Sequence, residues 1–144
     1  MSTSDKVYHG SCLCGAVAYD VTGPLRDIVY CHCSQCQKSS GHHFAATAAP
    51  LENFRLTEDR GLKWYKSSEW ADRGFCGTCG ANMLWRLKGG ERMGILAGSL
   101  DDCSDLKAVS HIFVADKKPY YAITDGLPQH PSYPAEMMPE PEGD

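Results

Sequence analysis

The spacing of the cysteines constrains this chain more than any other feature of its sequence. Seven of the eight cysteines fall into three tight groups, which are Cys12 and Cys14, then Cys31, Cys33 and Cys36, then Cys76 and Cys79. A structural zinc site is closed by four protein ligands, whereas a catalytic zinc site has three protein ligands and an open position. Seven thiols in this order therefore predict two zinc sites, one closed and one open.

A disulfide framework is the alternative for a chain of this length with eight cysteines. The tight C-x-C and C-x-x-C groups favour metal binding over disulfides. Residues 1–6 lack the apolar run of a secretory signal, and no stretch approaches the roughly 18 apolar residues of a membrane span. We therefore expect a cytoplasmic protein without a membrane partner, in which the thiols stay reduced and available to metal.

The length and net charge of the chain limit the number of domains and the classes of partner. A chain of 144 residues suits one domain with its own core, and a formal net charge of -4 gives no basic surface for nucleic acid. From residue 128 onward, five prolines alternate with acidic and polar residues, which is typical of an extended tail. We expect a disordered leader at 1–6, a single zinc-binding β domain at 7–127 and a Pro-rich acidic tail at 128–144.

Segments with strand-like patterns recur at intervals of roughly ten residues. The expected strands are 15–21, 27–30, 44–49, 54–57, 62–66, 81–87, 92–97, 111–115 and 120–124. In the first of them Val17, Tyr19 and Val21 share one face, as in a half-buried strand. The cysteine-rich segment 31–41 is expected to be a loop with one helical turn. The pattern predicts an all-β domain of mainly antiparallel short strands with little helix.

The run Cys76-Gly77-Thr78-Cys79-Gly80 is the strongest local signal. Two cysteines three apart on a tight turn can direct both sulfurs at one ion, and the glycines permit positive φ. A redox C-x-x-C motif is the alternative, but it would require a helix directly after it, and a strand-like run follows instead. We therefore interpret this run as half of a zinc site.

Cys12 and Cys14 are a weaker signal by themselves. Residues two apart in an extended chain face the same side, so both sulfurs can reach one metal, but two such cysteines can equally be core residues. The C-x-x-C pair needs two more ligands. The simplest closed zinc site with four ligands therefore combines the two pairs, Cys12 and Cys14 with Cys76 and Cys79. Zinc bound there would contribute to folding directly.

The three clustered cysteines Cys31, Cys33 and Cys36 lack an obvious fourth protein ligand. His32 lies between two of them and would point away from both in an extended segment. It is therefore a candidate for supporting the ligands or meeting the substrate, more than for binding the metal.

Four further side chains are candidates of lower weight, which are Lys38, His42, His43 and Cys103. Lys38 and His32 are candidate catalytic groups, for carboxylate binding or proton transfer. The two later histidines can supply a ligand or a general base, or can be polar residues at the rim of the site. Cys103 is interpreted as a free thiol.

A zinc ion on three thiolates favours a particular chemistry. It can bind an incoming thiol, lower the pKa of that thiol and hold it beside an electrophile such as a carbonyl group. Hydrolysis by zinc-activated water is less favoured, because three thiolates neutralise the zinc charge and no carboxylate stands next to the three cysteines. We expect formation or cleavage of a carbon–sulfur bond.

Several runs of the chain match one known family in the same order, from about residue 7 to residue 133. They are Gly10-Ser11-Cys12-Leu13-Cys14-Gly15-Ala16-Val17, Cys31-His32-Cys33-Ser34-Gln35-Cys36, Arg73-Gly74-Phe75-Cys76-Gly77-Thr78-Cys79-Gly80, Gly98-Ser99-Leu100-Asp101-Asp102, His111-Ile112-Phe113-Val114 and Asp125-Gly126-Leu127-Pro128. In these runs the chain resembles the glutathione-dependent formaldehyde-activating enzyme family, whose domain also occurs in a centromere-associated protein.

The resemblance implies a tent-like β fold of the kind shared with a zinc-binding nucleotide-exchange-factor family. It also implies a structural zinc on the first and last cysteine pairs, and a looser zinc on Cys31, Cys33 and Cys36 that meets the glutathione sulfur. The implied reaction is addition of glutathione to formaldehyde, giving S-hydroxymethylglutathione, which is a carbon–sulfur lyase activity in reverse. The implied partners are a small thiol and an aldehyde, with glutathione as candidate co-substrate.

Two other functions stay open at the level of sequence. The chain can be a non-catalytic zinc-binding interaction module, in which both zinc ions are structural and a group such as His43 closes the second site. It can also be a thiol buffer or redox sensor that uses the three clustered cysteines together with Cys103.

Overall fold

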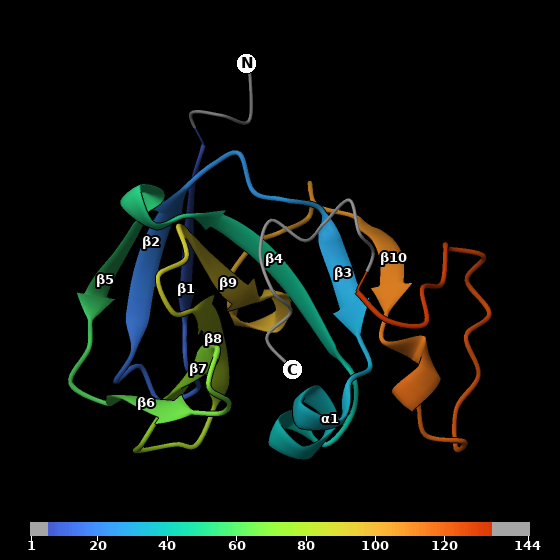
Figure 1. Ribbon diagram of the computed structural model, residues 1–144. Helices are drawn as coiled ribbons and strands as arrows, with labels where there is room; N and C mark the ends of the chain where they lie inside the picture. The colour runs from blue at the N-terminus through green and yellow to red at the C-terminus, as the bar shows by residue number, and fades with distance from the viewer. Residues whose placement is uncertain (1–5, 134–144) are drawn as a thin grey trace.

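The computed structural model describes residues 6–133 as a β protein with one α-helix (Figure 1). The strands are β1 (Val7–Ser11), β2 (Ala18–Thr22), β3 (Ile28–Cys31), β4 (Phe44–Pro50), β5 (Phe54–Glu58), β6 (Leu62–Lys66), β7 (Ala71–Cys76), β8 (Asn82–Leu87), β9 (Arg92–Leu96) and β10 (Ala108–Ile112). The helix α1 spans Ser34–Ser40, and three short 3-10 turns lie at Leu51–Asn53, Ala97–Ser99 and Val114–Asp116. The expected all-β fold class with little helix is confirmed. Within the described residues, no helix is long and apolar enough to cross a membrane.

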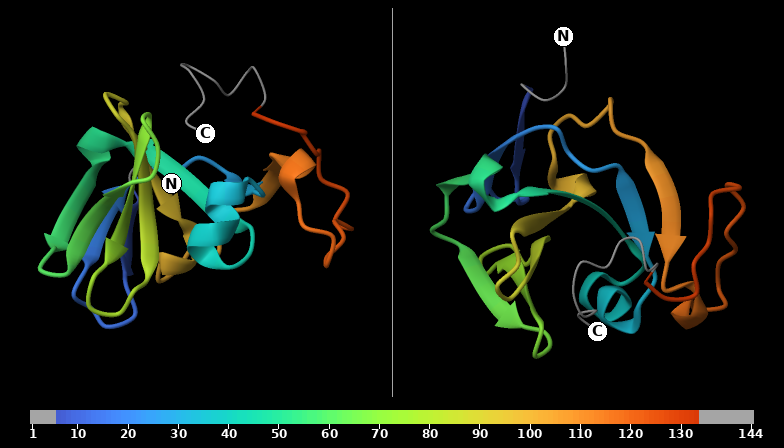
Figure 2. Two further views of the ribbon diagram at one scale, coloured as in Figure 1. Left: turned by 60° about the horizontal axis from the view of Figure 1, so that its bottom comes forward. Right: turned by 45° about the horizontal axis from the view of Figure 1, so that its top comes forward.

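The strands form two sheets. One has the order β1-β2-β5, and the other has the order β10-β3-β4-β9-β8-β7-β6. All pairs are antiparallel except β10 with β3, which run parallel. Figure 1 and both views of Figure 2 show β3 and β10 on one side of the molecule, and the small sheet beside the β6 end of the long sheet. The long sheet therefore connects the two regions that contain the cysteines.

The main core lies between the small sheet and the β6–β9 part of the long sheet. The face predicted from alternation is buried, with Val17, Tyr19 and Val21 at most 1% exposed. The Tyr19 ring stacks on Phe54 at 5.1 Å, and its hydroxyl lies 2.6 Å from Ser99 Oγ. Full burial of each such side chain stabilises the fold by about 1.5–3 kcal/mol.

A second, smaller core surrounds the three clustered cysteines. Val29 and Ile112, from the parallel strands β3 and β10, pack with these cysteines, and Phe44 and Phe113 cover them in part. These three cysteines are thus part of the packing of the β10–β3–β4 region, whereas Cys12 and Cys76 belong to the main core and Cys79 packs against it.

Most expected strands agree with the structure to within a few residues, but three segments differ. The segment expected as strand 111–115 forms β10 at Ala108–Ile112, and 120–124 is not a strand. Tyr121 in that segment instead places its side chain against His32. The cysteine-rich segment contains a seven-residue helix, which is longer than the single turn expected.

Two strands, β1 and β7, were absent from the sequence-based expectation. In β1, Gly10 stands on the buried face opposite Tyr19, so the apolar alternation is interrupted where the Tyr19 ring needs the space. In β7, Asp72 and Gly74 are residue types that strands disfavour. Pairing with β6 and β8 on both sides overrides that local preference.

The first residues of the expected tail run beside β10. His111 N–H donates to Pro128 O at 2.9 Å, His130 N–H donates to His111 O at 2.9 Å, and Val114 N–H donates to His130 O at 3.0 Å. Residues 1–5 and 134–144, which include most of the expected leader and tail, lie outside the described residues. The boundaries expected at 7 and 127 therefore remain predictions.

Candidate metal centres

The first group of sulfurs comes from two loops that the main core brings together. Cys12 and Cys14 follow β1, while Cys76 ends β7 and Cys79 lies in the turn after it. The four sulfurs all lie within 4.8 Å of one another. Cys14 Sγ is 3.8 Å from both Cys12 Sγ and Cys76 Sγ. Four sulfurs at about 2.3 Å from a tetrahedral zinc are separated by about 3.8 Å, so this group fits a four-thiolate site.

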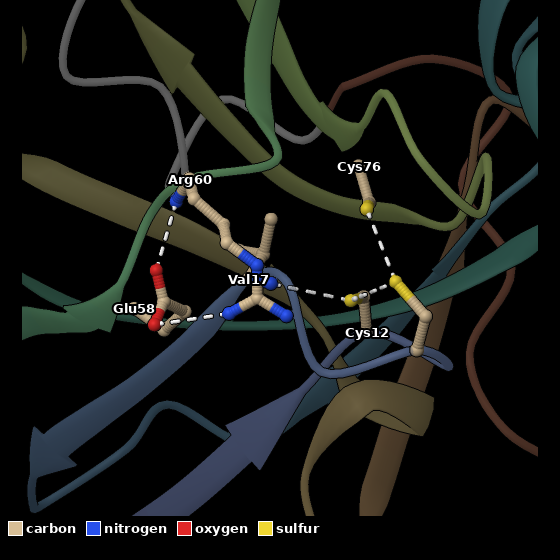
Figure 3. A network of polar contacts seen from close by, with 6 residues as sticks. Cys12, Val17, Glu58, Arg60 and Cys76 are labelled. Carbon is tan, nitrogen blue, oxygen red and sulfur yellow. Dashed lines mark hydrogen bonds and ion pairs between the residues drawn. The ribbon is translucent and has the colours of Figure 1, made fainter.

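Backbone N–H groups point at these sulfurs, which favours thiolates. Val17 N–H donates to Cys12 Sγ at 3.3 Å (Figure 3), and the N–H groups of Thr78 and Cys79 both donate to Cys76 Sγ at 3.4 Å. Burial raises the pKa of Cys12, but the Val17 hydrogen bond and neighbouring thiols outweigh it and lower that pKa. The Ala81 N–H lowers the pKa of Cys79 to about 6. The local backbone therefore prepares this site for a cation.

The second group of sulfurs lies where β3 ends and α1 begins. Cys31 is the last residue of β3, Cys33 caps α1 by accepting from Cys36 N–H at 3.3 Å, and all three cysteines are at most 8% exposed. Their sulfurs lie within 4.8 Å of one another, with Cys31 Sγ and Cys36 Sγ 3.2 Å apart. Among residues 6–133, no histidine nitrogen or carboxylate oxygen joins either sulfur group. The second group thus offers three ligands.

The thiols of the second group need a nearby positive charge to become thiolates. Burial raises the pKa of the Cys36 thiol, and the hydrogen bond with Cys33 raises the pKa of Cys31. None of the eight cysteines, all of which lie in the described residues, forms a disulfide, so no disulfide competes for these sulfurs. A divalent cation bound to the three sulfurs would supply the missing positive charge.

Arg73 is a functional candidate that the sequence-based reasoning missed. It lies on β7 and is 6% exposed, and its Nη1 and Nη2 lie 4.0 Å and 3.9 Å from Cys36 Sγ. Its guanidinium carbon lies 5.6 Å from the centre of the Phe44 ring. The signal in the sequence was its place at the start of the family-matching run 73–80, three residues before Cys76.

His32 is fully buried, and its ring contacts other rings instead of joining the sulfurs. His32 Nδ1 lies 2.6 Å from Tyr121 Oη, His32 Nε2 lies 2.9 Å from His111 Nδ1, and His111 Nε2 lies 2.8 Å from Asp125 Oδ2. Because a carboxylate only accepts, neutral rings must donate in the order Tyr121, His32, His111, Asp125. Burial, followed by the charge of His43, lowers the pKa of His32 to about 4. His32 therefore links the segment between two cysteines to the C-terminal part of the fold.

The remaining candidates occupy different places. Lys38 is exposed on α1, so the structure does not turn it toward the buried sulfurs. His42 Nδ1 lies 2.6 Å from Tyr120 Oη, and His43 packs between His32 and His42 with ring centres at 4.6 Å and 4.2 Å. Cys103 packs against the main core, away from the second sulfur group. The structure thus brings His43, but not Lys38 or Cys103, to the buried ring cluster.

Comparison with known proteins identifies the family of this chain. The family model of the glutathione-dependent formaldehyde-activating enzyme matches residues 7–116, a range that contains both sulfur groups. The chain belongs to this family. It is 29% identical over 87 residues to an uncharacterized lyase of Schizosaccharomyces pombe, which is 58% of this chain and 61% of that protein. The chain therefore spans about three fifths of the length of this curated relative.

The fold is also found in a solved structure. A crystal structure of a Rhodobacter sphaeroides protein matches with a TM-score of 0.54 and 25% identity, covering 70% of this chain and 99% of that chain. The family match and this structure therefore agree on the fold. The cysteine groups can hold metal ions.

This member of the formaldehyde-activating enzyme family has a pocket beside the first sulfur group. The pocket has a volume of about 630 Å³ and is lined by Ser11–Leu13, Phe44–Ala45, Ala81–Met83, Leu96 and Gly98–Asp101. Cys12 of the first group lines it, whereas none of Cys31, Cys33 and Cys36 does. Phe44, which also lines it, packs against the three-cysteine group. Small-molecule sites have volumes of roughly 300–1,000 Å³, so the pocket falls within their size range.

Proposed function

We propose that the protein is a zinc-dependent carbon–sulfur lyase that forms or cleaves a thiol–aldehyde adduct, such as S-hydroxymethylglutathione. The observation that carries the proposal is the buried group of Cys31, Cys33 and Cys36, which converges on one point without a fourth protein ligand among residues 6–133. Three protein ligands and an open position are the pattern of catalytic zinc sites. Family membership and the lyase-named relative support the same reaction class.

The two sulfur groups have different roles in this proposal. Cys12, Cys14, Cys76 and Cys79 hold a structural zinc that ties the loop after β1 to the end of β7. The three-cysteine group holds a second zinc, which, when bound, supplies positive charge for an incoming thiolate. Soft thiolate ligands select zinc over hard cations such as magnesium.

The residues of the chain orient and enclose the reacting groups. Gln37 Nε2 donates to His32 O at 2.6 Å and to Asp116 O at 2.8 Å, so the loop between two ligands is held in place. The adduct forms when the thiol loses its proton, sulfur attacks the carbonyl carbon, and the C=O electron pair moves to oxygen, which takes up a proton. Burial of the cysteines excludes water from this exchange.

Metal content and turnover test the proposal together. Native mass spectrometry of chelator-free protein should show two zinc ions for the wild type and for the control Cys103→Ala, and one for Cys33→Ala. Both two-zinc proteins should convert glutathione and formaldehyde to the adduct, and Cys33→Ala should not. Full activity of Cys33→Ala would refute the proposal. Two tightly held zinc ions without turnover or glutathione binding would favour the interaction module.

A further inference from the structure

Arg73 has an unusual environment for a buried charge. It stands three residues before Cys76 on β7, so the two side chains leave opposite faces of the strand. Cys76 joins the first sulfur group, while both terminal nitrogens of Arg73 face Cys36 of the second group, at 3.9 Å and 4.0 Å. One strand thus contributes to both groups.

Arg73 has no acidic partner in the described part of the chain. No carboxylate oxygen of residues 6–133 lies within 4.0 Å of its guanidinium, and its buried Nε has no hydrogen-bond partner. A guanidinium remains protonated in proteins, and a buried charge without a counter-charge is strongly unfavourable. The terminal nitrogens of Arg73 contact the sulfur of Cys36. Among the described residues, the cysteine group is therefore the source of compensating negative charge that lies against the guanidinium.

We infer that Arg73 is the counter-cation of the three-cysteine group and a positioning residue for metal and thiolate at that site. The inference rests on the proposed function, because it needs a divalent metal on Cys31, Cys33 and Cys36. Three thiolates (-3) and a divalent ion (+2) sum to -1, and Arg73 (+1) brings the sum to zero. When a substrate thiolate binds as the fourth ligand, the net charge of the site becomes -1. Without Arg73 the net charge would be -2.

The charge balance predicts an effect on metal binding that does not depend on turnover. Cysteines lose their protons when metal binds, so the metal-bound group is more negative than the metal-free group. A fixed cation 4 Å away therefore favours the bound state. Removal of groups that support metal ligands typically weakens metal binding by about 10- to 100-fold.

Chelator competition on the intact protein measures this effect. Arg73→Met should hold the second metal about 10- to 100-fold more weakly than the wild type, with the first site unchanged. Arg73→Lys, which keeps the charge, should recover most of the affinity. The control is Arg86→Met on β8, because Arg86 stacks on Trp64 at 3.7 Å and pairs with Asp72, without a contact to a cysteine. Circular dichroism and retention of the first metal report folding, and Arg73→Gln replaces Arg73→Met if the latter unfolds.

A thiol titration of the cobalt-substituted proteins completes the test. Both 2-mercaptoethanol and 3-mercaptopropionate should bind Arg73→Met more weakly than the wild type, by a similar factor, because the shared group is the thiolate. A loss confined to 3-mercaptopropionate would overturn the inference in favour of carboxylate binding. Equal metal and thiol affinities in wild type and Arg73→Met would overturn the inference alone. A wild type that holds one metal would overturn the proposed function, and the inference with it.

Discussion

His32 Nε2 lies 2.9 Å from His111 Nδ1, although the residues are 79 positions apart. Both rings are at most 4% exposed, and Asp125 accepts from the far side of His111. The contact joins the end of β3 to the end of β10, the two parallel strands next to the three-cysteine group.

Replacing His111 with phenylalanine should destabilise the fold. His111→Phe retains a ring at the site but leaves His32 Nε2 buried without a partner, which costs about 1–3 kcal/mol. The free energy of unfolding in urea measures the loss. His9→Phe is the control, because His9 is an exposed histidine paired with Asp20, and it should change stability by no more than about 0.5 kcal/mol. Equal stabilities of the two variants would show that the His32–His111 contact contributes nothing.

Loss of a ligand should have different consequences in the two sulfur groups. Cys76 is fully buried in the main core and joins β7 to the loop after β1, so Cys76→Ser should remove structural metal and unfold the domain. Cys33→Ser should stay folded, because serine can replace Cys33 as the cap of α1. Thermal unfolding followed by circular dichroism, with metal analysis, measures both effects. A folded Cys76→Ser protein beside an unfolded Cys33→Ser protein would reverse the assignment.

His43 should stay neutral below the usual titration range of histidine. Burial, followed by the charges of His42 and His111, lowers its pKa, and the ring also packs against Tyr30, His32 and Tyr121. In NMR titrations of the intact protein, the His43 ring should show a midpoint below about 6.5.

The sign of the linked stability change follows from proton binding. Below about pH 6.5 the unfolded chain binds a proton at His43 that the native state does not, so stability falls as pH decreases through this range. His43→Gln should therefore lose less stability than the wild type between pH 7.5 and the folded-state midpoint. A wild-type midpoint above 6.5 would contradict the prediction.

Gly10 should not tolerate a side chain. A Cβ at this position would overlap the Tyr19 ring and lie 2.7 Å from the backbone oxygen of Ser99. Gly10→Ala should cost about 1–3 kcal/mol through overpacking. Gly98→Ala is the matched control, because within residues 6–133 nothing apart from its own chain neighbours lies within 4 Å of its Cβ position. Urea unfolding of both variants measures the difference, and a Gly10→Ala protein as stable as Gly98→Ala would disprove the close packing.

Local patterns in the sequence were sufficient for the fold class and for the spacing of the cysteines within each run. A C-x-C or C-x-x-C spacing constrains its own sulfurs, and alternation in 17–21 identifies the buried face of β2 without knowledge of its neighbours. The strands β1 and β7 could not be predicted in this way. Their glycines and charged residues oppose strand formation locally, and only pairing with adjacent strands decides their conformation.

The sequence by itself therefore determined the local cysteine spacings and that the chain forms short, mainly antiparallel strands. Only the tertiary structure decided which other side chains surround the second sulfur group. Arg73 is 37 residues from Cys36, and His111 is 79 residues from His32. Such contacts depend on the order of strands in the long sheet, and no local spacing encodes that order. Burial and sheet pairing, which are properties of the whole chain, bring a cation and a histidine pair to the three cysteines.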